Sequence, residues 1–74
     1  MKYKLTDETI DVNGRILRRI ECVESFIDVK AGDKGGFIES EKNLSQDGNA
    51  WVSGDAKVYG SAWVSGDARV YGNA

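Results

Sequence analysis

Residues 48–74 read Gly-Asn-Ala-Trp-Val-Ser, Gly-Asp-Ala-Lys-Val-Tyr, Gly-Ser-Ala-Trp-Val-Ser, Gly-Asp-Ala-Arg-Val-Tyr and Gly-Asn-Ala. Four units of six residues follow one another without a gap, and three residues of a fifth unit come after them. A repeat this short cannot bury its apolar residues alone, so it has to stack on its neighbours. This stretch therefore decides the fold class.

Each six-residue unit predicts a short strand followed by a corner. In residues 54–59, Ala56 and Val58 alternate with Lys57 and Tyr59, which places the two pairs on opposite faces of a strand. The glycine that begins each unit suits a corner, because glycine readily adopts positive φ angles. The predicted inward residues are Ala50, Val52, Ala56, Val58, Ala62, Val64, Ala68 and Val70. The predicted outward residues are Trp51, Ser53, Lys57, Tyr59, Trp63, Ser65, Arg69 and Tyr71.

The hexads resemble those of left-handed parallel β-helices, in which an aliphatic residue is followed four positions later by a small one. Val58 with Ala62 and Val64 with Ala68 fit that pattern. The resemblance implies three hexads per coil, or about 18 residues. Such a coil stacks Trp51 on Arg69, Ser53 beside Tyr71 and Asn49 over Asp67. A two-sided coil would instead stack Asp55 on Asp67, and we prefer the three-sided coil because like charges directly opposite are destabilising.

The N-terminal region predicts an antiparallel hairpin that caps the repeats. Asn13-Gly14 supplies the two positive φ angles of a type I′ turn. The expected pairs are Val12 with Arg15, Ile10 with Leu17 and Glu8 with Arg19. One face then carries Ile10, Val12 and Leu17, and the other carries Ile16, Ile20 and Cys22. We expect one of these faces to cover the end of the repeats.

The glycine-rich residues 31–36 predict a structural bend. A phosphate-binding loop is disfavoured, because no Gly-Lys-Ser/Thr opens a helix there. Phe37, Ile38 and Leu44 are the predicted inward positions of an irregular first coil. Leu44 and Val52 are eight residues apart, which indicates a two-residue insertion around residues 46–47. The predicted fold is all-β, with a β-hairpin cap over residues 1–36 and a short parallel β-solenoid over residues 37–74, in one compact domain.

Residues 29–41, followed by Asn43-Leu44-Ser45, Gly48, Trp51-Val52 and an Ala-Lys-Val-Tyr unit, resemble a family of phage and prophage proteins. That family carries an N-terminal cap and hexapeptide-like repeats, under polymer-forming or hexapeptide-transferase-like names. The resemblance covers nearly the whole chain and brings no catalytic residues with it. It implies a location in the cytoplasm of a host cell.

Composition excludes several classes of function. The net charge of −2 leaves no electrostatic footprint for nucleic acid. No apolar run is long enough to cross a membrane, and residues 1–7 lack the apolar core of a signal peptide. Cys22 is the single cysteine, which excludes an internal disulfide and favours the reducing cytoplasm. We expect Cys22 to be a small buried hydrophobe.

The residue content argues against an enzyme. Hexapeptide acyltransferases need a general base, usually histidine, and this sequence contains none. Without histidine only hard oxygen ligands remain for a metal, and no calcium-loop spacing occurs. Asp55 and Asp67 sit at corners, where aspartate commonly caps turns. We therefore expect no catalytic residue, no metal and no cofactor.

The outward aromatic residues predict a binding surface, although they could also simply cover the thin sheet faces. The candidate interface residues are Trp51, Trp63, Tyr59, Tyr71, Arg69 and Val70. The preferred function is a non-enzymatic, oligomerising assembly module that forms a homodimer through its C-terminal coil, with a trimer through Trp51 and Trp63 as the competing geometry. A phage-encoded inhibitor of a host defence protein is the second hypothesis, and an acyltransferase-like enzyme is the third.

Overall fold

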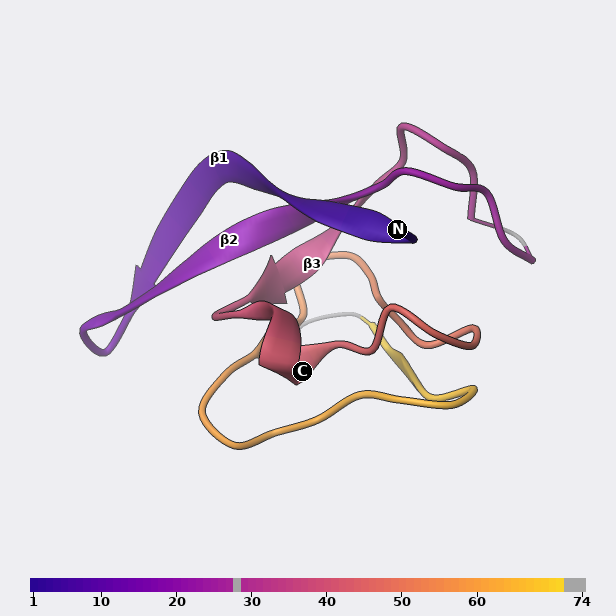
Figure 1. Cartoon of the computed structure of the whole chain (residues 1–74). Coiled ribbons are helices and arrows are strands. Elements are labelled where there is room, and N and C mark those ends of the chain that lie inside the picture. The colour runs from indigo at the N-terminus through magenta and orange to yellow at the C-terminus, as the bar shows by residue number, and fades with distance from the viewer. Residues whose placement is uncertain (28, 72–74) are drawn as a thin grey trace.

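Short strands and tight glycine corners build an all-β chain. The computed structural model describes residues 1–27 and 29–71. The elements are β1 (Tyr3–Val12), β2 (Arg15–Cys22), β3 (Lys34–Ile38), a 3-10 helix η1 (Glu41–Asn43), β4 (Trp51–Val52), β5 (Lys57–Val58) and β6 (Arg69–Val70). One mixed sheet has the order β1-β2-β3-β5, and β4 pairs with β6 in a second sheet. In Figure 1 the long β1–β2 hairpin lies across the looped repeat region.

The predicted hairpin turn is confirmed. Asn13 and Gly14 adopt φ angles of 52° and 85°, the positive values that a type I′ turn requires. The confirmed pairs are Val12 with Arg15 and Ile10 with Leu17.

The predicted backbone pair of Glu8 with Arg19 is wrong. The register shifts between Leu5 and Thr9, so that Leu5 faces Ile20 and β1 contains a bulge. Within the bulge the Thr6 hydroxyl donates to the carbonyl oxygen of Arg19 at 2.8 Å. Glu8 and Arg19 still meet, but through their side chains.

The predicted face of Ile16, Ile20 and Cys22 divides into a buried part and an exposed part. Ile20 and Cys22 pack into the hydrophobic core, whereas Ile16 is 52% exposed. The pairing of β2 with β3 reaches Arg18 and Ile38, so Ile16 lies beyond the end of the strand that would cover it. The hairpin therefore caps the repeats with its base and extends past them with its tip.

The glycine pair in the middle of the chain belongs to a strand, so the bend predicted over residues 31–36 is wrong for Lys34, Gly35 and Gly36. A Cβ atom on Gly35 would lie 2.5 Å from the carbonyl oxygen of Val52, and one on Gly36 would lie 2.5 Å from that of Ala56. Glycine is required here because β3 lies directly against the backbone of the repeats.

Parallel pairing stacks two layers of the chain. Phe37 pairs with Lys57 and Leu44 with Val64, each across twenty residues, whereas Trp51 pairs with Arg69 across eighteen. The predicted insertion around residues 46–47 explains this change, because only the first two intervals contain it. We call residues 37–53 the first layer and residues 56–71 the second layer.

The predicted stacking partners also meet. Besides the pair of Trp51 with Arg69, the Asn49 side-chain amide donates to the Asp67 carboxylate at 3.3 Å. The amide of Ser53 donates to the carbonyl oxygen of Val70 at 2.7 Å. These contacts contradict the two-sided coil of twelve residues, which would have paired Trp51 with Trp63.

The hydrophobic core contains the predicted inward residues of the first layer and part of the second. Its members are Tyr3, Ile20, Cys22, Val29, Ile38, Leu44, Ala50, Trp51, Val52, Ala56, Val58 and Val64. Three inward predictions need correction, because Ala62 and Ala68 are exposed and Val70 is only partly buried. Among the described residues no strand pairs with the far side of the second layer, so nothing covers them.

Phe37 also departs from its predicted position. It follows the alternation of β3 and therefore lies on the opposite side from Ile38, which is in the core. Phe37 is buried there because the guanidinium of Arg19 covers its ring at 4.3 Å from the centroid.

The inserted residues attach the N-terminus to the first layer. The Gln46 side-chain carbonyl accepts the amides of Lys2 and Tyr3 at 2.8 and 3.2 Å, and its NH₂ group donates to the Tyr3 carbonyl at 3.3 Å. Lys2 Nζ donates to the carbonyl oxygen of Ala50 at 2.6 Å, and the Tyr3 hydroxyl donates to that of Leu44 at 2.5 Å.

Burial lowers the pKa of Lys2. Burial, with a smaller contribution from Glu41, raises the pKa of Tyr3 to about 12.

Two further expectations concern the limits of the repeats. Residue 36, where we expected the cap to end, lies inside β3. The fifth repeat unit, residues 72–74, lies outside the described residues.

None of the helical segments in the described part of the chain has the length and apolar character needed to span a bilayer.

Candidate functional site

The predicted interface residues divide between two surfaces. Trp51, Arg69 and Tyr71 line a pocket between the cap and the repeats. Trp63 belongs to the second layer and does not line that pocket, and neither does Tyr59. Val70 lies on the last strand, at the uncovered side of the second layer.

Trp51 is the predicted outward residue that the structure buries, because only 3% of its surface is exposed. Phe26 covers it in an edge-to-face arrangement, with ring centroids 5.4 Å apart and an interplanar angle of 71°. Phe26 is held by a bridge to Val29, in the segment between β2 and β3. Strand alternation placed Trp51 on the outward face correctly but could not show that the cap folds over that face.

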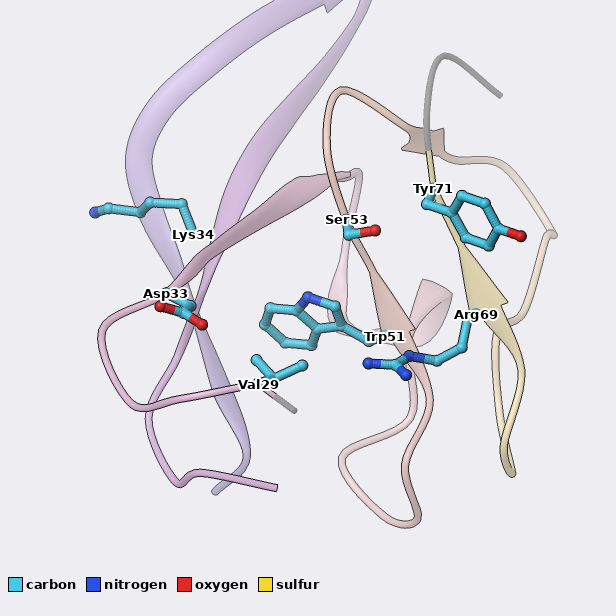
Figure 2. Close-up of a pocket in the computed structure, with 7 residues that line it drawn as sticks. All are labelled: Val29, Asp33, Lys34, Trp51, Ser53, Arg69 and Tyr71. Carbon is cyan, nitrogen blue, oxygen red and sulfur yellow. The ribbon is translucent and has the colours of Figure 1, made fainter. Parts of the chain in front are cut away.

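The pocket, which we call the Trp51 pocket, has a volume of about 510 Å³. Figure 2 shows its lining residues: Val29, Asp33 and Lys34 from the cap, Trp51 and Ser53 from the first layer, and Arg69 and Tyr71 from the second. Sequence reasoning missed these three cap residues: Asp33 and Lys34 were interpreted only as part of a bend, and Val29 only as part of the stretch that resembles a protein family. The predicted stacking of Ser53 beside Tyr71 could have identified Ser53 as a residue of this pocket.

The polar groups at the rim of the Trp51 pocket have partners of their own. Lys34 Nζ donates to Glu21 at 2.8 Å, and this hydrogen bond is the main reason that the pKa of Glu21 is lowered. The Asp33 carboxylate accepts the backbone amide of Lys30 at 3.0 Å. The Ser53 hydroxyl makes a long contact of 3.4 Å with the carbonyl oxygen of Val70 and remains able to turn toward the pocket.

Cys22 has the properties of a structural residue, as predicted. It is buried in the core, and its thiol donates to the carbonyl oxygen of Glu24 at 3.2 Å. Burial, followed by the charge of Asp33, raises the pKa of the thiol, so the nucleophilic thiolate is disfavoured. Among residues 1–27 and 29–71, no group of three or more His, Cys, Asp or Glu side chains is placed to hold a metal ion.

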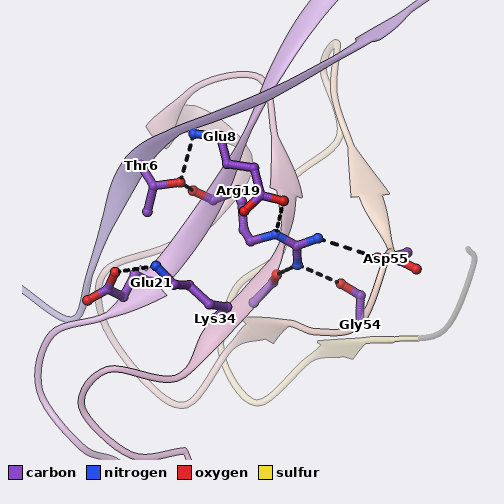
Figure 3. Close-up of polar contacts among 8 residues, drawn as sticks. Thr6, Glu8, Arg19, Glu21, Lys34, Gly54 and Asp55 are labelled. Atoms are coloured by element: carbon purple, nitrogen blue, oxygen red, sulfur yellow. Dashed lines mark hydrogen bonds and ion pairs between the residues drawn. The ribbon is translucent and has the colours of Figure 1, made fainter.

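Arg19 ties the hairpin to a corner of the repeats (Figure 3). Its Nε atom donates to Glu8 at 2.9 Å, and its NH1 group donates to the carbonyl oxygen of Gly35 at 2.7 Å. Its NH2 group forms an ion pair with Asp55 at 3.5 Å. Asp55 therefore has a structural partner, and so does Asp67, which accepts from Asn49.

The second surface is the uncovered side of the second layer, which we call the open edge. Backbone amides of the first layer donate to carbonyl oxygens of the second layer. These donors are Phe37, Glu39, Ser45, Asn49, Trp51 and Ser53, and the acceptors are Ala56, Val58, Val64, Gly66, Ala68 and Val70. In the second layer the equivalent amides of Lys57, Tyr59, Ser65, Asp67 and Tyr71 have no such acceptor among the described residues.

Two large aromatic side chains of the second layer are strongly exposed. Trp63 and Tyr71 are 58% and 70% exposed, as the alternation predicted. Tyr59 is 38% exposed and lies under the guanidinium of Arg15, 5.6 Å from the ring centroid. Tyr59 thus covers a sheet face and stacks on a long side chain, whereas Trp63 is the more accessible of these two residues.

Comparison with known proteins identifies a partial relative of this chain. No protein-family model matches the chain. The chain is 40% identical over 59 residues to a protein of Escherichia coli (strain K12) described as the uncharacterized acetyltransferase YdcK. The alignment covers 69% of this chain but only 18% of the relative, so the chain spans about a fifth of that protein's length. The similarity fits the coarse interpretation of this chain as a hexapeptide-repeat protein of a transferase-like type.

Proposed function

We propose that this chain is a non-enzymatic assembly module, in which the hairpin caps a left-handed parallel β-solenoid of three hexads per coil. The open edge of the second layer binds a second copy of the chain. The observation that carries this proposal is a row of second-layer amides that have no acceptor among residues 1–27 and 29–71, at the positions where the first layer donates to its neighbour. An unpaired strand edge of this kind is a template for pairing with another chain.

The cap determines how many copies can assemble. On the far side of the first layer, β2 pairs with β3, and the Lys2 and Tyr3 side chains bind carbonyl oxygens of the first layer. That side is therefore closed to a further layer. With one open edge in the described part of the chain, packing two chains about a two-fold axis covers both edges at once, and such closed dimers are the commonest symmetric assembly.

Apolar burial supplies a driving force for the dimer. Ala62, Ala68 and Val70 occupy inward positions of the repeat yet remain accessible at the open edge. Each methyl or methylene group that a partner removes from water contributes about 0.8 kcal/mol. Pairing of the edge amides adds to this, since an amide buried without an acceptor costs about 1–3 kcal/mol.

Multi-angle light scattering at micromolar concentration tests the proposal. We expect twice the 8.1 kDa mass of one chain. Val70→Glu should return the monomer mass, because it places a charge on the open edge. Trp63→Ala is the matched control and should remain dimeric. A monomer mass for the native chain would end the proposal, and a trimer that Trp63→Ala dissociates would favour assembly through the flat faces instead.

A phage or prophage setting, with the host cytoplasm as location, is part of the proposal and rests on the resemblance of residues 29–41. In that setting a second role is open to the same module, namely inhibition of a host protein. The exposed Trp63 and Tyr71 side chains favour a protein partner, because large exposed aromatic residues are typical of binding surfaces.

Acetyl transfer is the other candidate, because the E. coli relative has acetyltransferase in its name. The present sequence lacks histidine, the usual general base that deprotonates the acceptor. Incubation with acetyl-coenzyme A and a panel of sugars and amines should give no product above the uncatalysed background. Transfer well above that background would replace the assembly module with an enzyme.

A further inference from the structure

We infer that the Trp51 pocket is a binding site for a small organic acid, whose carboxylate accepts a hydrogen bond from the indole nitrogen of Trp51. The pocket shares Arg69 and Tyr71 with the second layer, whose open edge we propose as the dimer interface, but the inference does not depend on dimer formation. A pocket of about 510 Å³ lies within the range of roughly 300–1,000 Å³ that is typical of small-molecule sites.

The first argument is the unpaired indole N–H of Trp51. The residue is 97% buried, yet its Nε1 atom has no hydrogen-bond partner in the described part of the chain. No side-chain nitrogen or oxygen there is both fully enclosed and without a partner, so Nε1 must be reached by solvent. Figure 2 shows this nitrogen on the ring edge that faces Ser53, inside the pocket. A buried tryptophan N–H usually finds an acceptor, and the pocket leaves that place open for a ligand.

The second argument is the balance of donors and acceptors around the pocket. The Trp51 indole and the Arg69 guanidinium carry only donors, and the Ser53 hydroxyl can donate, whereas the ammonium group of Lys34 is bound to Glu21 and points away from Trp51 (Figure 2). Among the described residues of the lining, Asp33 carries the carboxylate, and it already accepts the amide of Lys30. A ligand rich in acceptors complements this set, and a carboxylate gains most because hydrogen bonds with charged partners are the strongest.

The third argument is the apolar part of the lining. Val29 and the rings of Trp51 and Tyr71 offer apolar surface beside the donors. A bare inorganic anion would leave that surface in water, whereas the body of an organic acid would cover it. The pocket therefore favours a carboxylate attached to a compact apolar or aromatic body over inorganic phosphate.

Nuclear magnetic resonance of the indole N–H provides the test. In Trp63→Phe, Trp51 is the remaining tryptophan, so the ¹H–¹⁵N spectrum contains a single indole signal. Titration with benzoate should shift this signal in a saturable way, with a Kd at or below about 1 mM. Benzamide, which has the same size without the charge, and inorganic phosphate, which lacks the apolar body, should each bind at least about tenfold more weakly.

Matched variants locate the site. In the Trp63→Phe background, Arg69→Gln should weaken benzoate binding about tenfold or more. Arg18→Gln removes the same charge outside the pocket, where Arg18 lies 3.9 Å from Asp7, and should leave binding unchanged. Equal shifts with benzoate and benzamide, or no saturable shift up to about ten times the expected Kd, would overturn the inference. If Arg69→Gln fails to fold, Ser53→Ala replaces it, with the same expected direction.

Discussion

The two repeat layers contain the same kinds of residue in different surroundings. Ala50 and Val52 of the first layer are completely buried, whereas Ala68 and Val70, their equivalents in the second, are exposed and partly buried. The hexad places all of them on the inward face, but burial requires a layer on each side. The cap supplies the missing neighbour for the first layer, and among the described residues nothing supplies it for the second.

The largest effect expected from this difference comes from placing aspartate at equivalent positions. Val52→Asp buries an unpaired charge in the core and should abolish cooperative thermal unfolding, monitored by circular dichroism. Val70→Asp should leave a folded monomer, because its carboxylate reaches water at the open edge. If the two variants are equally destabilised, the layers do not differ as described.

A smaller effect is expected from the corner glycines. Gly48 and Gly66 have similar positive φ angles of 70° and 62°, so alanine is strained to a similar extent at both. A Cβ atom on Gly48 would lie 2.8 Å from the carbonyl oxygen of Gly66, whereas one on Gly66 meets nothing within 4 Å. Gly48→Ala should therefore cost about 1–3 kcal/mol more than Gly66→Ala in urea unfolding. Equal losses would mean that the layers are not stacked at this corner.

The smallest effect concerns the attachment of the cap to the first layer. Tyr3→Phe removes the hydrogen bond to the carbonyl oxygen of Leu44 and should cost about 1 kcal/mol at neutral pH. The native pKa of about 12 lies above the ordinary value of 10.0, so the folded state retains a proton that the unfolded state releases. The stability that Tyr3 contributes is thus complete below pH 10 and is lost as the pH rises through 12.

Thermal unfolding between pH 9 and pH 12 checks this linkage. The native protein should lose stability more steeply over that range than Tyr3→Phe does. Lys2, whose pKa is lowered by burial, acts in the opposite direction as the pH rises toward 10.5, but both proteins contain it. Parallel pH profiles for the two proteins would show that the phenol is not buried in the folded state.

Local patterns predicted the parts of the fold that depend on neighbouring residues. Asn13-Gly14 predicted the hairpin turn, and the spacing of Leu44 and Val52 predicted the insertion that later appears as a change from twenty to eighteen residues between stacked pairs. The bulge in β1 and the strand character of Lys34–Ile38 could not be predicted in this way. Both depend on contacts with distant segments, such as the approach of β3 to the backbone of Val52.

In the candidate site, too, local patterns predicted the face on which a residue lies but not which distant segment covers it. Alternation correctly brought Trp51, Arg69 and Tyr71 to one face, but it predicted an exposed Trp51. The burial of Trp51 arises from Phe26, which lies in the segment between β2 and β3 and for which we made no prediction from the sequence. The cap residues Asp33 and Lys34 reach the pocket for the same reason, since a turn-rich stretch does not indicate which distant surface it will cover.

Amide hydrogen exchange as a function of protein concentration tests the central claim most directly. First-layer amides such as Trp51 and Ser45 should be protected at every concentration, because they donate to the second layer. The second-layer amides of Lys57, Ser65 and Asp67 should exchange rapidly in dilute solution and become protected as the dimer forms. If these amides exchange rapidly at concentrations where the mass is that of a dimer, the open edge is not the interface and the proposed assembly is wrong.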